Sequence, residues 1–176
     1  MNERTTGHLQ GIYRDIVKNG EGITVRDSGW TANTIVERCR ILLAGFMRND
    51  PSDGIRHLAV GQGLAAWDDG GPPVPDPVAI GLVTPYTPPV PFAELTVAYL
   101  DEGLTEVALP TSRLQITAIL APGYPAPPAG FTAYPLREFG LFGRLNGTEF
   151  MINSIRHPVI HKDPAATLIR MIRLFF

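Results

Sequence analysis

The sequence predicts an α+β protein, in which an N-terminal β-hairpin and one amphipathic helix pack on a mainly antiparallel β body with long Pro/Gly loops. Three observations predict it. One early stretch has helical periodicity, several later stretches are rich in β-branched residues, and the 18 glycines and 17 prolines gather in runs between them. Because the helix comes early and does not alternate with strands, the order favours α+β over α/β.

The hairpin is predicted at the N-terminal end. Residues 11–17 and 22–26 are strand-like, and Asn19-Gly20 lies between them. Both of these residues tolerate the positive φ that a tight hairpin turn requires. We therefore expect two antiparallel strands joined by a short turn.

The helix is predicted over residues 34–47, and its apolar residues form a single stripe at a period of 3.6. Thr34 and Glu37 have the spacing of a capping box. The helix is expected to stop at Asn49-Asp50-Pro51, because the residue before proline avoids the helical region. The stripe consists of Ile35, Val36, Cys39, Leu42, Leu43 and Phe46.

Further strands are predicted over 55–60, 113–120, 150–155 and 168–176, from β-branched enrichment and partial alternation. In the last segment two faces are expected to alternate along the strand, and we expect the terminal Phe175 and Phe176 to be shielded from water. One face holds Leu168, Arg170, Ile172, Leu174 and Phe176, and the other holds Ile169, Met171, Arg173 and Phe175.

Three runs, 68–77, 84–91 and 121–130, are dense in proline and glycine. Proline lacks the amide donor and fixes φ, so these runs are expected to be loops or extended arms and neither regular helix nor inner strand. Loops of this length favour contacts with neighbouring chains. We divide the chain into an N-terminal hairpin and helix, 1–50, and a β domain, 51–176, and expect both to form one compact unit.

Composition excludes several classes of protein. There are 15 Lys+Arg against 17 Asp+Glu, so no broad basic field is available for nucleic acid. The long uncharged stretch 77–93 contains five prolines, which excludes a membrane span. Residues 1–4 lead into polar residues, so we expect no secretory signal and a product made in the cytoplasm. The single Cys39 suits such a compartment.

The residues that best resemble a catalytic site are His157, His161 and Asp163, which are ligand types for zinc or iron. Pro158 makes a helix improbable there, and in an extended strand the two histidines lie about 13 Å apart at ~3.3 Å per residue. Cys39 lies in the apolar stripe, where a thiol is a packing residue. We expect no enzyme, no metal site and no cofactor, and keep a small metal-dependent enzyme at these residues as an alternative.

A resemblance to a known family adds a more specific expectation. Residues 55–63, IRHLAVGQG, are followed by Trp67-Asp68 and a proline-rich loop; residues 131–143 read FTAYPLREFGLFG, and residues 168–174 read LIRMIRL. These segments resemble I-x-H-x-A-V-G-D-G, G-F-x-I-R-E-V-G-L-F-D and L-V-I-R-M-x-L of phage tail-collar fibre proteins, with Gln62 in place of an aspartate. Similar patterns occur in contractile injection machines.

The resemblance implies a non-enzymatic structural subunit of a phage tail or contractile injection particle, an adaptor at the baseplate or the tail-fibre junction. It would be made in the bacterial cytoplasm and reside in the assembled virion or injection machine. Its partners would be other tail, baseplate or fibre subunits and further copies of itself in a ring or trimer. A cap or terminator at the other end of the tube is an alternative, and Trp30, Trp67 and the tyrosines leave open a glycan-binding β module.

The interface candidates follow from this hypothesis. Apolar residues around Gly140 predict a compact strand in which glycine permits close backbone approach. Arg137 and Glu138 are placed to form an ion pair that fixes orientation more than stability. The interface candidates are Trp67, Tyr86, Tyr124, Arg137, Glu138, Phe139, Phe142, Phe175 and Phe176.

Overall fold

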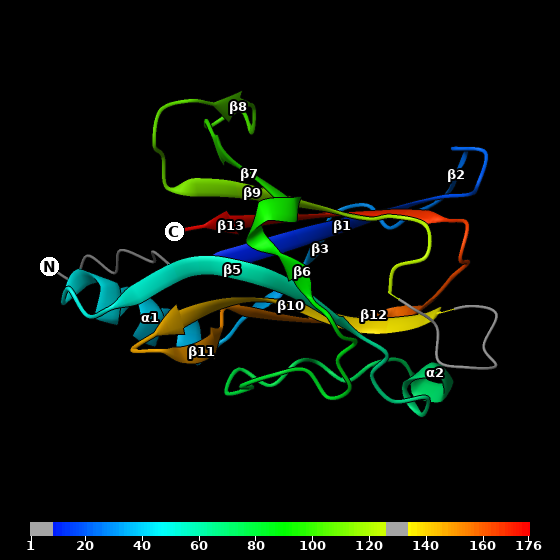
Figure 1. The fold of residues 1–176 in the computed structure, drawn as a ribbon, viewed down its shortest axis with the longest axis horizontal. Helices are drawn as coiled ribbons and strands as arrows, with labels where there is room; N and C mark the ends of the chain where they lie inside the picture. The colour runs from blue at the N-terminus through cyan, green and yellow to red at the C-terminus, as the bar shows by residue number, and fades with distance from the viewer. Residues whose placement is uncertain (1–8, 126–133) are drawn as a thin grey trace, which may run out of the picture.

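Two antiparallel sheets, an N-terminal hairpin and one short helix of about three turns make up the protein (Figure 1). This computed structural model describes residues 9–125 and 134–176. The predicted fold class is therefore confirmed. Among the described residues, no helix has the length and apolar character needed to cross a membrane.

The first sheet has seven strands, and its centre joins the two ends of the sequence. β1 pairs with β13 in one continuous register from Gln10 opposite Phe175 to Lys18 opposite Thr167. The order is β2 (Thr24–Asp27), β1 (Gln10–Lys18), β13 (Thr167–Phe175), β9 (Arg113–Leu120), β7 (Leu95–Leu100) and β8 (Glu106–Val107), and β3 (Thr31–Ala32) also pairs with β1.

The second sheet has six strands and lies face to face with the first (Figure 1). Its order is β4 (Thr34–Ile35), β12 (Asn153–Lys162), β10 (Tyr134–Leu145), β5 (Ser52–Gly61) and β6 (Val90–Pro91), and β11 (Thr148–Met151) also pairs with β10. The helices are α1 (Glu37–Met47), the single turn α2 (Trp67–Gly70) and the 3-10 turn η1 (Phe92–Glu94). Both sheets thus combine strands from 1–50 with strands from 51–176.

The core lies between the sheets because the strands alternate. On β13 the side chains of Leu168, Arg170, Ile172 and Leu174 are buried and those between them are half-buried, so the predicted alternation is confirmed. The expectation for the last two residues is wrong in part, since Phe175 is half-buried but Phe176 is 47% exposed. Phe176 follows the end of β13 at the open end of the sandwich.

The N-terminal hairpin is confirmed, with a turn that is held by one side chain. Asn19 Oδ1 accepts hydrogen bonds from the amides of Glu21 and Ile23, at 3.0 and 2.9 Å. The residue with positive φ is Gly22, two positions after the predicted Gly20. The loop is therefore a longer Asx-type turn than the two-residue hairpin turn that Asn-Gly indicated.

The helix begins later than predicted. Thr34 belongs to β4, where it pairs with Ser154, so the predicted capping box is wrong; the N-cap is Val36, without a side-chain hydrogen bond. Sheet pairing holds Thr34 extended and overrides the capping pattern. Phe46 of the predicted stripe is exposed, because the helix turns Gly45 toward β10, where a Cβ would lie 2.6 Å from Leu145 Cδ1.

The remaining predictions hold to different degrees. β9 matches residues 113–120, β5 extends the predicted strand 55–60 at its N-terminal end, and the predicted strand 150–155 is divided between β11 and β12. β7 was not predicted.

The predictions for the proline-rich runs hold in part. The first run begins inside α2, so its exclusion from helix is wrong there. β6 lies at the edge of its sheet, as proline requires. Residues 126–130 of the third run lie outside the described residues.

Candidate functional site

A proline-rich segment covers the outer face of the second sheet. We call this segment, residues 62–89, the strap; it passes below β10 and β12 in Figure 1. The Gln62 amide donates to Thr84 O at 2.9 Å and joins the two ends of the strap. The Tyr86 amide donates to Val60 O of β5, and the Glu37 amide of α1 donates to Pro77 O, both at 2.8 Å, and these bonds tie the strap to the rest of the protein. The strap is thus an ordered layer of this chain.

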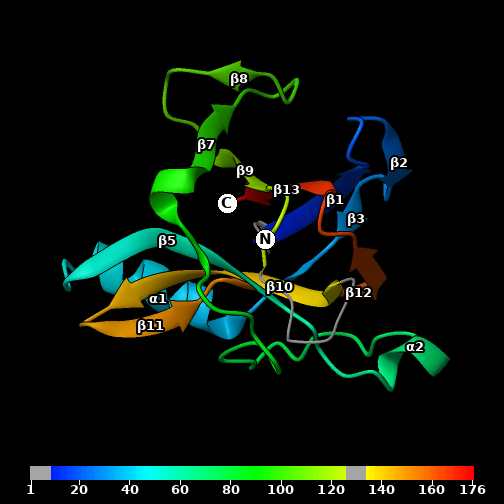
Figure 2. The same ribbon diagram turned by 45° about the vertical axis from the view of Figure 1, so that its right-hand side comes forward.

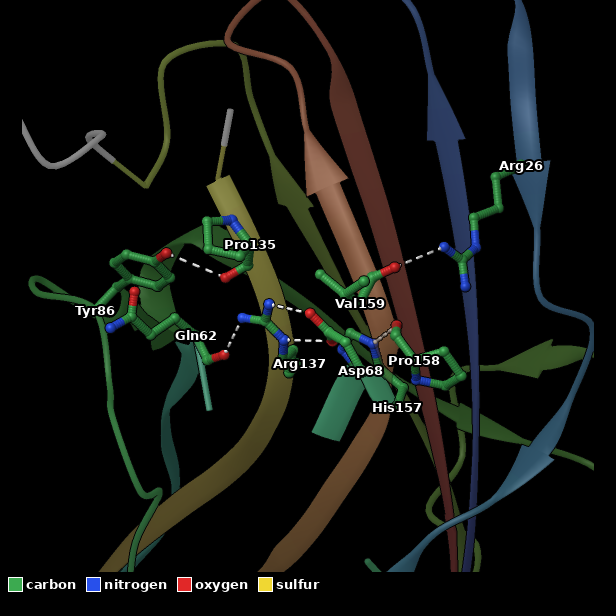
Figure 3. A network of polar contacts seen from close by, with 9 residues as sticks. All are labelled: Arg26, Gln62, Asp68, Tyr86, Pro135, Arg137, His157, Pro158 and Val159. Carbon is green, nitrogen blue, oxygen red and sulfur yellow. Dashed lines mark hydrogen bonds and ion pairs between the residues drawn. The ribbon is translucent and has the colours of Figure 1, made fainter. Parts of the chain in front are cut away.

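Arg137 fastens the first part of the strap to β10 (Figure 3). Its Nε and Nη2 donate to the Asp68 carboxylate at 2.8 and 2.6 Å, and its Nη1 donates to Gln62 O at 2.9 Å. The hydrogen bond from Arg137 lowers the pKa of Asp68, and the same bond raises the pKa of Arg137. This two-pronged pair fixes α2 on the sheet with defined geometry.

Glu138 fastens the last part of the strap. Its carboxylate is buried and accepts hydrogen bonds from the amides of Val83 and Thr84, at 3.0 and 2.7 Å. The expected ion pair between Arg137 and Glu138 is therefore wrong. Each of the two adjacent residues binds a different part of the strap, because Asp68 and the two amides supply the partners that these buried charges require.

A small second core lies beneath the strap. It consists of Val36, Ala59, Phe142 and Met151, against which Ala79 and Leu82 pack. Trp67 is also buried and lies under the Arg156 guanidinium, 4.9 Å from the ring centroid. The indole approaches Gly63 so closely that a Cβ there would lie 2.5 Å from it.

The two tyrosine candidates hold the strap and the loop beside it. The Tyr86 hydroxyl donates to Pro135 O at 3.1 Å, and the Tyr124 hydroxyl donates to Pro88 O at 2.7 Å. Burial raises the pKa of Tyr86, and burial together with the nearby Glu94 carboxylate raises that of Tyr124 to about 12. Both rings are half-buried.

Most interface candidates are thus buried or half-buried by contacts within this chain. Trp67, Arg137, Glu138, Phe139 and Phe142 are buried, Tyr86, Tyr124 and Phe175 are half-buried, and Phe176 is exposed. Whether any of them contacts another chain stays a prediction.

The outward side of the strap is apolar. Val74, Val78, Ile80 and Val83 are 84%, 60%, 64% and 46% exposed. The prolines of this segment were predicted to form a loop, but these apolar residues were not singled out. The signal that could have found them is a series of β-branched residues within a proline-rich loop, where polar residues are the usual choice.

A buried charged cluster connects the sheets. Arg170 on β13 donates to Asp15 on β1 at 2.7 and 2.8 Å, and its Nη2 lies 3.0 Å from His157 Nε2 on β12. His157 Nδ1 lies 2.9 Å from Pro158 O (Figure 3), so the neutral imidazole carries its proton on Nδ1 and accepts at Nε2. Burial, with Arg170 close by, lowers the pKa of His157 to about 4.

The metal-site residues do not converge. A register shift between β10 and β12, at Leu136 to Glu138, puts His157 in the core and His161 on the exposed surface. The Asp163 carboxylate accepts from the Ala165 amide in the turn after β12. In the described part of the chain, no three such ligand residues come together.

A separate apolar cleft of about 360 Å³ opens between the two sheets near the C-terminus. Cys39 lies on its wall with a thiol whose pKa burial raises to about 11. A protonated thiol in apolar surroundings is a packing group and a poor nucleophile. The cleft is lined by Cys39, Leu42, Leu43, Gly54, Ile55, Phe92, Val97, Ala98, Tyr99, Leu114, Ile152, Leu174 and Phe176.

The fold and these sites define a two-sheet antiparallel β protein whose proline-rich loop is built into its surface. Comparison with protein-family models, curated proteins and solved structures finds no match to this chain. The function is therefore argued from the chain itself.

Proposed function

We propose that this protein is a non-enzymatic structural subunit of a phage tail or contractile injection particle, an adaptor at the baseplate or tail-fibre junction. One observation carries the proposal: the strap is rigidly fastened to its own sheet and yet presents apolar side chains outward. An ordered apolar surface of this kind is typical of a protein that binds another protein.

The anchoring of the strap supports a role in assembly. Arg137 and Glu138 each use charged hydrogen bonds to hold it, and they do so on either side of Val78 and Ile80. A preordered loop loses little conformational entropy on docking. Repeated copies in a particle would multiply a modest contact into stable attachment. The resemblance of residues 55–63, 131–143 and 168–174 to tail-collar proteins supplies the particular kind of particle.

The test is incorporation into particles. Particles purified from the producing bacterium are labelled with an antibody against this protein and viewed by electron microscopy. Label confined to the baseplate or fibre end is expected. Label at the opposite end would contradict the adaptor role, and particles free of the protein would overturn the proposal.

A variant tests whether the strap is the surface that docks on the particle. Val78→Asp with Ile80→Asp places charges at two exposed positions, so the fold is expected to persist while incorporation falls at least about tenfold. Leu109→Asp, at an exposed position between β8 and β9, is the matched control and should incorporate normally. Undiminished incorporation of the double variant would show that the strap is not the docking surface.

A further inference from the structure

The apolar cleft marks an end of the sandwich that the described residues leave open. Its inner wall is formed by core residues such as Leu42 and Leu174, whereas Phe92, Tyr99 and Phe176 on its rim are exposed. A cavity of this size with almost purely apolar walls favours apolar side chains as its occupant.

Two strand edges border this cleft. β6 pairs with β5 only at His57 and Leu58, so residues 52–56, where β5 bulges opposite β10, have no strand on their other side among the described residues. Residues 95–98 of β7 likewise pair with β9 alone. Free N–H and C=O groups on an edge are satisfied by an added strand. The occupant is therefore an extended segment.

Gly54 has no side chain to cover the backbone at the β5 edge. It is exposed, it lines the cleft, and a Cβ built on it meets no atom within 4 Å. An incoming strand can therefore approach the backbone there without a side chain in the way.

The chain presents a matching segment at its other end. β2 is the edge strand of the first sheet, all four of its residues are exposed, and it lies far from the C-terminus (Figures 1 and 2). Ile23, directly before β2, and Val25, the unpaired residue where β2 bulges against β1, are 58% and 61% exposed. Arg26 ties β2 to the second sheet, donating to Val159 O at 3.2 Å. The Asn19 side chain preorders the turn before them.

We propose that β2 of one copy, with Ile23 directly before it, enters the cleft of the next copy as an added strand and places Ile23 and Val25 in the apolar cavity. The contact joins different surfaces of two copies, so it is head-to-tail and builds a ring or, if the rotation does not close, a filament. This inference rests on the proposed function and names a second copy of this chain as the partner.

The experiment uses two variants, each blocked at one end. Val25→Asp places a charge on β2, and Gly54→Leu fills the mouth of the cleft from a position with free space. In sedimentation or light-scattering measurements over a range of concentrations, the wild type is expected to form oligomers. Each variant alone should raise the dissociation constant at least about tenfold. Leu109→Asp is the control and should associate as the wild type does, and circular dichroism checks that all variants fold.

Mixing the two blocked variants is the decisive step. The cleft of Val25→Asp is intact and β2 of Gly54→Leu is intact, so an equimolar mixture should form one-to-one dimers that grow no further. A wild type that stays monomeric, or a mixture that gives no dimer, overturns the inference. So does an effect of Gly54→Leu without one of Val25→Asp, since the cleft would then hold a different segment or a small apolar molecule.

The two proposals fail separately. Incorporation into particles without head-to-tail association in solution leaves the proposed function standing and overturns this inference. Head-to-tail association by a protein that is absent from particles leaves this inference standing and overturns the proposed function.

Discussion

Arg170 is a charged residue in the centre of the protein, and its neighbours explain how it is tolerated. Its side chain is fully buried, forms a two-pronged pair with Asp15 and lies over the Phe139 ring, with the guanidinium carbon 3.5 Å from the centroid. Two buried ions recover their desolvation cost only with such geometry. The pair therefore specifies how β1 and β13 face the second sheet more than it adds stability.

Arg170→Met is expected to lower the free energy of unfolding by about 3–5 kcal/mol, because it leaves the Asp15 carboxylate buried without its partner. Adding Asp15→Leu should restore most of the loss, since an apolar pair of similar size is often neutral or better. Urea unfolding of the wild type, both single variants and the double variant measures this coupling. Losses that simply add would show that the two residues act independently.

His157 makes stability depend on pH. Its pKa is about 4 in the folded protein, from burial and the nearby Arg170, against the ordinary 6.5. Between these values the unfolded chain binds a proton that the folded protein does not, so stability is complete above pH 6.5 and falls as the pH drops toward 4, by up to about 3 kcal/mol. The other charged groups facing the imidazole are Asp15 and Arg26.

The comparison that isolates this effect is with His157→Gln, whose amide oxygen can still accept from Arg170. Unfolding free energies of both proteins are measured from pH 7 to pH 4. The wild type should lose more stability than the variant over this range. Parallel curves would mean that other groups cause the acid sensitivity.

Glu138 controls a local part of the strap. Glu138→Ala should leave the Val83 and Thr84 amides without an acceptor, at a cost of about 1.5–3 kcal/mol for hydrogen bonds to a charged group. Hydrogen exchange at these two amides should rise strongly, while exchange in β13 follows only the global stability. Glu138→Gln, which keeps one acceptor oxygen, is the graded control. Unchanged exchange at both amides would contradict the assigned bonds.

At the scale of elements, β10 is the strand on which the second sheet is built. It pairs with β5 on one side and with β11 and β12 on the other, and its glycines let these neighbours approach. A Cβ on Gly140 would lie 2.5 Å from Asn153 O and 2.8 Å from Met151 Cε. The backbone oxygen cannot move without disturbing the start of β12.

Gly140→Ala is therefore expected to destabilise the protein by about 1–3 kcal/mol, the usual cost of overpacking. Gly70→Ala, where a Cβ meets no atom within 4 Å, is the matched control and should stay within about 0.5 kcal/mol of the wild type. Thermal unfolding of both variants measures the difference. Equal midpoints would mean that the strands move apart at little cost.

The sequence predicts the elements best where pairing and periodicity agree. β9 and the alternation of β13 were predicted because each is a regular strand with one buried face. The helix start failed at Thr34, since a local capping pattern cannot reveal that β12 holds this residue in a sheet. Gly45, and not Phe46, faces β10, because the space left by the neighbouring strand decides which side of α1 packs against it. The local sequence does not show this space.

The candidate site was predicted only in part, for the same reason. Arg137 and Glu138 were singled out, but their partners, Asp68 and the amides at 83 and 84, are more than fifty residues away in the sequence. The His157 side chain could be placed only once the register shift in β12 was known. Contacts between distant segments have no local signal in one sequence.

At the scale of the whole molecule, the sheets divide the chain differently from the sequence. The predicted segments 1–50 and 51–176 do not form separate layers, because β1 lies between β2 and β13 in the first sheet and β4 borders β12 in the second. Asp15 on β1 also supplies the counter-charge of Arg170. β1 is thus part of the core, whereas all four residues of β2, at the other end of the hairpin, are exposed.

The fragment 51–176 is accordingly expected not to fold on its own. Without β1, the edge of β13 and its Arg170 would lose the neighbours that cover them, and proteins of this kind have a margin of only about 5–15 kcal/mol against such losses. Dispersed amide signals in NMR and a cooperative thermal transition are the measurements, and both should be absent from the fragment. Adding the peptide 1–50 in trans should restore them, since β1 pairs along its whole length with β13. A fragment that unfolds cooperatively without the peptide would show that 51–176 is a domain in its own right.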